Sequence, residues 1–111
     1  MVRARIFRKE DRIEGFSVSG HADAYAEVGQ DVVCAGISAL VINAVNSIEQ
    51  FTSSRFSCET AGEEGGRIEF SLTERADAAD TQLLLSSMVL GLSEIEQQYG
   101  NEYLTLEFKE V

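Results

Sequence analysis

Apolar and polar residues alternate in five short segments of the chain, and this period of two is typical of a strand with one buried face. The segments cover residues 2–6, 13–19, 55–60, 68–73 and 104–109. A polar turn joins the first two segments, and a glycine-rich turn over residues 61–66 joins the next two. Each of these pairs therefore predicts a β-hairpin.

Two longer segments repeat their apolar residues every three or four positions, which predicts amphipathic helices. The first follows Asp31, whose carboxylate would cap the free amides of the first turn, and it ends near Phe51. The second opens within residues 77–80, where acidic residues suit the helix dipole. It ends near Tyr99, before a stop at Gly100.

The resulting order, β-β-α-β-β-α-β, predicts an α+β fold, a two-layer sandwich with two helices packed on a mixed or mainly antiparallel sheet. We expect residues 1–111 to form a single domain. The second helix is apolar nearly all round. Because a two-layer domain leaves one face of each helix exposed, we expect this helix to contact a second copy, so that the chain forms a homodimer.

The chain is strongly acidic, with 19 Asp and Glu residues against nine Lys and Arg residues and a formal net charge of −10. This balance disfavours direct binding to nucleic acid, which depends on clustered basic side chains. Solubility explains the charge, and so does a basic partner or substrate. The charge alone does not decide between these two explanations.

The first residues contain no apolar signal core, and no apolar run approaches the ~20 residues that cross a bilayer. We therefore expect a cytoplasmic protein that does not associate with a membrane. In that compartment its two cysteines, Cys34 and Cys58, are expected to be free thiols.

Thiol chemistry is the activity that the segment from Gly20 to Ser38 favours. It holds the only histidine, His21, and one of the two cysteines, Cys34. With Asp31 as the N-cap, Cys34 is the third residue of the helix, where free N–H groups and the helix dipole lower the pKa of a thiol. His21, at the end of a strand, could pair with the thiolate and protonate a leaving amine.

The residues around Cys34 fit the same chemistry. Ala35 and Gly36 are small and would leave room for a peptide backbone. Ser38 lies one helical turn beyond Cys34 and can reach the same surface. Residues 22–30 form a long loop of small and polar residues, which is typical of a lid.

Spacing alone leaves structural explanations of these residues open. Cys34 could be a small core residue, His21 a turn residue, and Asp31 a plain N-cap rather than a group that orients the histidine. Cys58 alternates with polar residues on a strand and is interpreted as structural. Two cysteines and one histidine are too few for a zinc site, and the glycines at 62–66 lack the lysine of a phosphate loop. We therefore expect no metal and no cofactor.

A longer motif adds to this picture. The chain has Gly-His-Ala at residues 20–22 and Gly-Gln-Asp-Val-Val-Cys-Ala-Gly-Ile-Ser-Ala-Leu at residues 29–40. This resembles the signature of the bacterial ribosomal-processing cysteine protease family, Prp, which is Gly-His-Ala, a loop, and then Gly-x-Asp-Ile-Val-Cys-Ala-Ala-Val-Ser-Ala-Leu opening a helix. The chain departs from it at Val32, Gly36 and Ile37. Its length and element order resemble the family from end to end.

The resemblance implies a homodimeric cysteine endopeptidase that removes the N-terminal extension of a basic large-subunit ribosomal protein, number twenty-seven, and so supports ribosome assembly. Such extensions end in a motif with two adjacent phenylalanines. By the motif match, Cys34 would be the nucleophile and His21 the general base and acid. The match also points to three supporting residues, Asp31, Ser38 and Gly20. It further implies a substrate loop that contains Ala22, Asp23, Tyr25 and Gly29.

Two other functions remain as alternatives. A non-catalytic ribosome-assembly factor would bind the same basic protein through its acidic surface, without turnover and without special reactivity at Cys34. A thiol sensor or oxidoreductase is the weaker alternative, because no Cys-x-x-Cys pair supports it.

Overall fold

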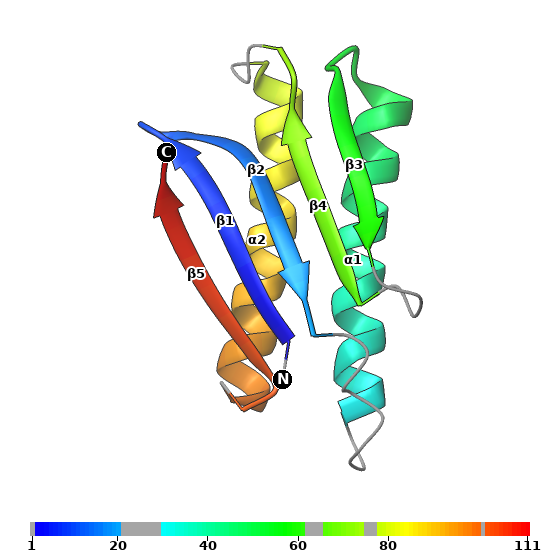
Figure 1. Cartoon of the computed structure of the whole chain (residues 1–111), viewed down its shortest axis with the longest axis vertical. Coiled ribbons are helices and arrows are strands. Elements are labelled where there is room, and N and C mark those ends of the chain that lie inside the picture. Colours follow the sequence, from blue (N-terminus) through cyan, green and yellow to red (C-terminus); the bar gives the residue numbers. More distant parts are fainter. Residues whose placement is uncertain (1, 21–29, 62–65, 75–77, 101) are drawn as a thin grey trace.

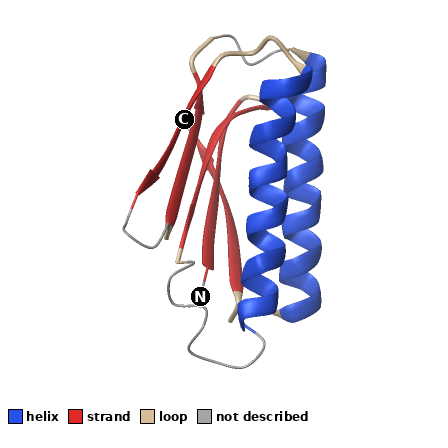
Figure 2. Ribbon diagram, turned by 90° about the vertical axis from the view of Figure 1, so that its right-hand side faces the viewer, coloured by secondary structure: helices blue, strands red, loops and turns tan. Residues whose placement is uncertain are grey.

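The computed structural model describes residues 2–20, 30–61, 66–74, 78–100 and 102–111. In these residues, seven elements follow one another in the expected order, β-β-α-β-β-α-β. They are β1 (Val2–Lys9), β2 (Arg12–Ser19), α1 (Gln30–Phe51), β3 (Phe56–Ala61), β4 (Arg67–Leu72), α2 (Ala79–Tyr99) and β5 (Leu104–Glu110). The strands form one sheet and both helices cover the same face of it, so the α+β two-layer fold is confirmed (Figure 1, Figure 2).

The sheet is mixed, with the strand order β3-β4-β2-β1-β5. The pairs β1–β2, β2–β4 and β3–β4 are antiparallel. β5 pairs in parallel with β1. The two hairpins therefore lie side by side through β2 and β4, and the last strand extends the far edge.

The core lies between the sheet and the two helices, and its residues follow the periods expected from the sequence. Phe70 of β4 stacks on Phe16 with 5.0 Å between ring centroids and meets Phe56 of β3 at 4.9 Å. On each helix, one stripe of residues at three- and four-residue spacing is buried against the sheet. The stripe of α1 is Val33, Ile37, Val41, Ala44 and Ile48, and that of α2 is Thr81, Leu85, Met88 and Leu92.

Helix α1 corrects one expectation from the sequence. Its residues Val32–Phe51 are long and apolar enough to cross a membrane, although we expected no such run. The helix instead packs its buried stripe on the sheet, and that stripe accounts for much of its apolar composition. A helix shared between a sheet and a neighbouring helix passes the same test of length and composition, so this segment is weak evidence for a membrane span.

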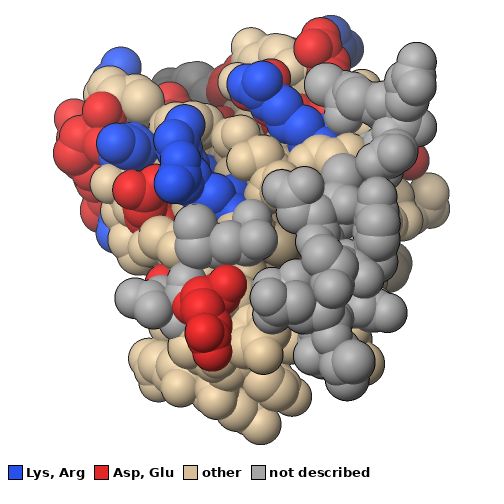
Figure 3. Space-filling view, turned by 60° about the horizontal axis from the view of Figure 1, so that its bottom comes forward, with Lys and Arg blue, Asp and Glu red and all other residues tan. Residues whose placement is uncertain are grey.

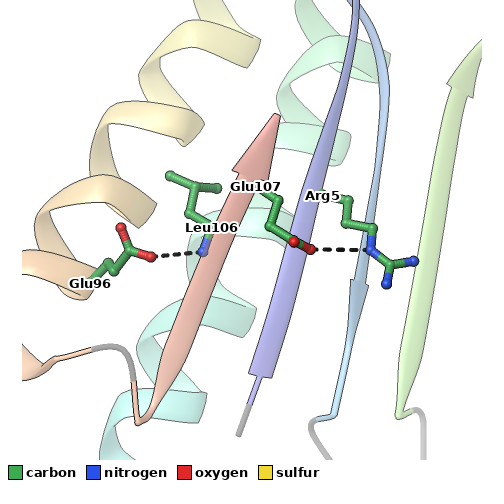
Figure 4. A network of polar contacts seen from close by, with 4 residues as sticks. All are labelled: Arg5, Glu96, Leu106 and Glu107. Carbon is green, nitrogen blue, oxygen red and sulfur yellow. Dashed lines mark hydrogen bonds and ion pairs between the residues drawn. The ribbon is translucent and has the colours of Figure 1, made fainter. Parts of the chain in front are cut away.

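The two edges of the sheet differ in how their backbone groups are covered. At the β5 edge, the Leu106 N–H donates to the Glu96 carboxylate of α2 at 2.8 Å, and Glu107 pairs with Arg5 of β1 at 3.4 Å (Figure 4). At the other edge, β3 pairs with β4, and residues 57–60 of β3 are exposed. The β5 edge is therefore covered at Leu106 by a side chain of α2, whereas residues 57–60 of β3 border solvent.

Candidate active site

The fold brings the carboxyl end of β2 and the amino end of α1 to the same end of the molecule (Figure 1). β2 ends at Ser19, and Gly20 follows with φ = 98°, a backbone conformation that residues with side chains rarely adopt. The Gly20 N–H donates to the carbonyl of Gly66, just before β4, at 3.0 Å. Gly20 therefore fixes how the chain leaves the sheet, one residue before His21 in the sequence.

The predicted general base and the predicted substrate loop lie outside the described residues. These residues are His21, Ala22, Asp23, Tyr25 and Gly29. Their roles stay predictions.

Helix α1 begins at Gln30, so the prediction that Asp31 is its N-cap is wrong. Asp31 is the second residue of the helix, and Cys34 is the fifth rather than the third. The physical reason for the error is that aspartate is favourable at two neighbouring places. It caps a helix from the position before it, and it also stabilises the first turn through the positive end of the helix dipole.

Cys34 remains beside the free N–H groups at the start of α1. The first amides of a helix have no acceptor within it, and among the described residues these are the N–H groups of residues 30–32. Because helical side chains lean towards the N-terminus, the side chain of the fifth residue lies over this turn. The Cys34 side chain is half-buried and packs against the core. A thiol in this place is fixed by packing, partly accessible, and close to positive electrostatic potential.

Ser38 lies one turn beyond Cys34 on the same face of α1 and is also half-buried. Gly36 faces another way, because a Cβ built on it would lie 3.8 Å from Ile95 Cδ1 of α2. The expectation that Gly36 makes room for a substrate backbone is therefore wrong. Two residues along a helix turn by about 200°, so Gly36 is directed towards the neighbouring helix while Cys34 is not.

Cys58 is a different kind of thiol. It is exposed on β3, and partial desolvation raises its pKa above the ordinary value for cysteine. A raised pKa keeps the thiol protonated, which is the opposite of what a nucleophile needs. Within the described part of the chain, no three His, Cys, Asp or Glu side chains gather where they could hold a metal ion.

The end of the molecule that carries the amino end of α1 displays both signs of charge (Figure 3). In this view, basic and acidic side chains lie close together on the left and towards the top. An ion pair between Arg67 and Glu69, at 2.8 Å, lies on the strand that begins at this end. This end of the molecule is therefore not purely acidic, although the chain as a whole has a negative net charge.

Comparisons with known proteins identify the family to which the chain belongs. The model of the family described as "Cysteine protease Prp" matches residues 1–104. The ribosomal processing cysteine protease Prp of Bacillus subtilis is 38% identical to this chain over 103 residues, which are 89% of this chain and 90% of that protein. The protein of the same name from Staphylococcus aureus (strain Mu50) is 34% identical over 100 residues, which are 90% and 91% of the two chains.

Two solved structures share the fold along nearly the whole chain. The crystal structure of the ribosomal processing protease Prp from S. aureus in complex with a substrate peptide has a TM-score of 0.87 and 31% identity, and the match covers 98% of this chain and 100% of that one. The structure of the same protease with a covalently linked product peptide has a TM-score of 0.85 and 32% identity, with the same coverage. From the family match and these relatives, the chain belongs to the Prp family of cysteine proteases and is a peptidase.

Proposed function

We propose that this peptidase removes the N-terminal extension of a basic large-subunit ribosomal protein, number twenty-seven, with Cys34 as the nucleophile and His21 as the general base and acid. The observation that carries the proposal is the position of Cys34. It is a half-buried thiol beside the free N–H groups of α1, at the end of the sheet where β2 leads into His21. The relatives named as ribosomal processing proteases support the choice of a ribosomal substrate.

In the proposed reaction, His21 takes the proton of the Cys34 thiol. The resulting thiolate attacks the scissile carbonyl carbon and forms a carbon–sulfur bond, while negative charge moves to the carbonyl oxygen. Free N–H groups at the start of α1 are suited to donate to that oxygen. When the carbonyl forms again, the carbon–nitrogen bond breaks, and His21 gives a proton to the leaving amine. His21 then takes a proton from a water molecule that attacks the thioester, which releases the acid and the thiol.

Three residues are proposed to support this chemistry. Gly20 sets the path of the chain into His21, and its positive φ excludes most other residues there. Ser38 lies on the Cys34 face of α1. Asp31 lies in the first turn, where a negative charge favours the helix start. We propose that a loop containing Ala22, Asp23, Tyr25 and Gly29 contacts the substrate.

The decisive experiment incubates the purified enzyme with the extended ribosomal protein and determines the new N-terminus by mass spectrometry. We expect a single cut at the end of the extension, no cut in a substrate that lacks it, and a rate about 10³-fold lower for His21→Ala, since general acid–base catalysis contributes on the order of 10²–10⁴. A wild-type enzyme that leaves the extended protein intact while cleaving unrelated peptides would overturn the ribosomal assignment.

The non-catalytic alternative is not retained, because the chain belongs to a family of peptidases. An assembly factor that only binds would show saturable binding to the extended protein without a shortened product. We further propose that the enzyme acts in the cytoplasm, where ribosomes are assembled.

We also propose a homodimer formed through the outer face of the two helices. Leu83 and Leu90 of α2 are 70% and 62% exposed and lie two turns apart on one face, and Val32 of α1 is 72% exposed. Exposed apolar residues grouped on one face, like Leu83 and Leu90, are typical of an interface. We expect a dimer in sedimentation velocity experiments and a monomer for the Leu83→Glu/Leu90→Glu variant with an unchanged circular dichroism spectrum. A monomeric wild type would overturn this proposal.

A further inference from the structure

We propose that the free edge of β3, together with an adjoining hollow between β3 and α1, binds the polypeptide substrate as an additional strand. The occupant is an extended stretch of peptide that carries one apolar side chain about three to five residues from the scissile bond. The inference rests on the proposed function, because it takes Cys34 as the reacting residue. It is carried by the backbone register of β3, the lining of the hollow, and the position of both relative to Cys34.

The register of the β3–β4 ladder shows which backbone groups of β3 are already bonded. The Thr73 N–H donates to the Arg55 carbonyl at 3.0 Å, just beyond the ends of the two strands. Hydrogen-bonded and non-hydrogen-bonded pairs alternate along an antiparallel ladder. The next hydrogen-bonded pairs therefore involve Ser57 and Glu59, whose N–H and C=O groups point towards β4.

It follows that the N–H and C=O groups of Cys58 and Thr60 point away from β4. In the described part of the chain, no strand pairs with that side of β3, and both residues are exposed. The side chains of Cys58 and Thr60 also line the hollow beside α1. The same two residues thus offer backbone partners for a peptide and walls for one of its side chains.

At the opposite edge of the sheet, a side chain of a helix covers one outward backbone group. There the Leu106 N–H of β5 donates to the Glu96 carboxylate of α2 (Figure 4). Edge strands are commonly blunted by proline, by lysine, or by a covering element. β3 contains neither proline nor lysine. Its open side is therefore the edge at which a peptide can add a strand.

The hollow lies between α1 and β3, which Figure 1 shows side by side, and has a volume of about 90 Å³. Its lining is mainly apolar, which suits one aliphatic or aromatic side chain. Two of its residues, Val41 and Val45, follow Cys34 by seven and eleven positions and so lie on the same face of α1 as the thiol. The lining residues are Val41, Ile42, Val45, Asn46, Cys58, Thr60 and Ile68.

The geometry of helix and strand gives the distance from the hollow to the thiol. A rise of about 1.5 Å per helical residue places Val41 and Val45 roughly 10 and 16 Å along α1 from Cys34. An extended peptide spans about 3.3 Å per residue, so the side chain in the hollow belongs to a residue about three to five positions from the scissile bond. In strand addition, backbone hydrogen bonds provide affinity and alternate side-chain pockets provide specificity.

The first test uses two neighbouring substitutions on β3. Cys58→Trp fills the hollow, whereas Ser57→Trp adds the same bulk on the opposite face of the sheet, because successive side chains of a strand alternate. With a synthetic peptide that spans the cleavage site of the extended ribosomal protein, we expect kcat/KM to fall about tenfold or more for Cys58→Trp and to stay within about twofold for Ser57→Trp. Equal rates for the two variants, with equal melting temperatures, would overturn the proposal.

The second test reads the backbone directly by amide hydrogen exchange. With the Cys34→Ala protein and the uncut peptide, the amides of Cys58 and Thr60 should exchange more slowly on binding. The amides of Ser57 and Glu59, already bonded to β4, should not change. Slower exchange that appears with protein concentration and without peptide would show that a second copy of the chain occupies the edge, and would overturn the proposal.

These outcomes separate the present inference from the proposed function. If the wild-type enzyme leaves the peptide intact, the proposed function fails. If the wild type cuts the peptide and Cys58→Trp cuts it equally well, only the role of the β3 edge fails. Replacing single apolar residues of the peptide by aspartate on each side of the scissile bond then reports which side enters the hollow.

Discussion

The two cysteines of this protein occupy contrasting environments. Cys34 is half-buried in the second turn of α1, packed on the core and beside the free N–H groups of the first turn. Cys58 lies on the exposed strand β3, where partial desolvation raises its pKa. The more exposed thiol is thus the less suited to act as a nucleophile.

The difference shows that reactivity here depends on local electrostatics more than on exposure. A helix start supplies aligned dipoles that favour a thiolate, whereas a strand carries almost no net dipole. Cys58 gains nothing to offset the desolvation it suffers beside α1. The predictions below test this contrast, beginning with the largest effect.

Replacing each cysteine by alanine should separate the two thiols most strongly. Cys34→Ala removes the proposed nucleophile, so we expect peptide cleavage to fall by about 10⁴-fold or more. Cys58→Ala removes a protonated thiol from β3 and only trims one wall of the hollow, so it should lower cleavage far less, by no more than about tenfold. Steady-state cleavage of one peptide by both variants measures the contrast, and substantial activity in Cys34→Ala would end the assignment of the nucleophile.

A core substitution beneath Cys58 should destabilise the fold without any direct effect on chemistry. Phe70 lies opposite Cys58 in the ladder and stacks between Phe16 and Phe56. Phe70→Ala should lower the free energy of unfolding by about 3–5 kcal/mol, since it removes a buried aromatic ring and leaves a cavity. Urea denaturation measures this loss, and Phe70→Leu, as the control, should recover part of it. A loss below about 1 kcal/mol would mean that the aromatic cluster does not hold β3.

Alkylation should distinguish the two thiols by pH. Since the pKa of Cys58 is raised, its labelling by iodoacetamide should stay slow at neutral pH and rise only above the usual cysteine value of about 8.5. The raised pKa of Cys58 also makes the free energy of unfolding depend on pH. The contribution of the protonated thiol is fully present below the usual cysteine value and is lost as the pH rises through the raised pKa. We expect Cys34 to react at least about tenfold faster at pH 7, and less so in His21→Ala. Peptide mapping by mass spectrometry measures the labelling of both cysteines. Equal labelling rates for Cys34 and Cys58 would contradict the proposed difference in reactivity.

Much of the fold could be predicted from the sequence, because strand and helix periods are local signals. The two hairpins, the two helices and the end of α1 at Phe51 were predicted from alternation and from three- and four-residue spacing. The order of strands in the sheet was not, because the pairing of β5 with β1 joins residues about a hundred positions apart. Such contacts leave no local pattern.

The site was predicted from a long motif, and its errors arose where one residue type suits two places. Asp31 fits an N-cap and a first helical turn equally well, so the start of α1 was misplaced by two residues, at Val32 instead of Gln30. Gly36 faces α2, where an added Cβ would make only an ordinary contact with Ile95, and no single-sequence pattern distinguishes this place from room for a substrate. The free edge of β3 follows from the strand order, which the sequence did not reveal.

The smallest effect is expected at Gly36, two residues from Cys34. Because an added Cβ would make an ordinary contact with Ile95 at 3.8 Å, Gly36→Ala should stabilise α1 by about 0.5–1 kcal/mol through helix propensity. Gly91→Ala is the matched control on α2, since its Cβ would lie only 2.8 Å from Leu40 Cδ1 and would force that side chain to move. Thermal unfolding should therefore separate the two variants, while cleavage stays within about twofold for Gly36→Ala. A large loss of cleavage with a raised melting temperature would indicate that the substrate does pass close to Gly36.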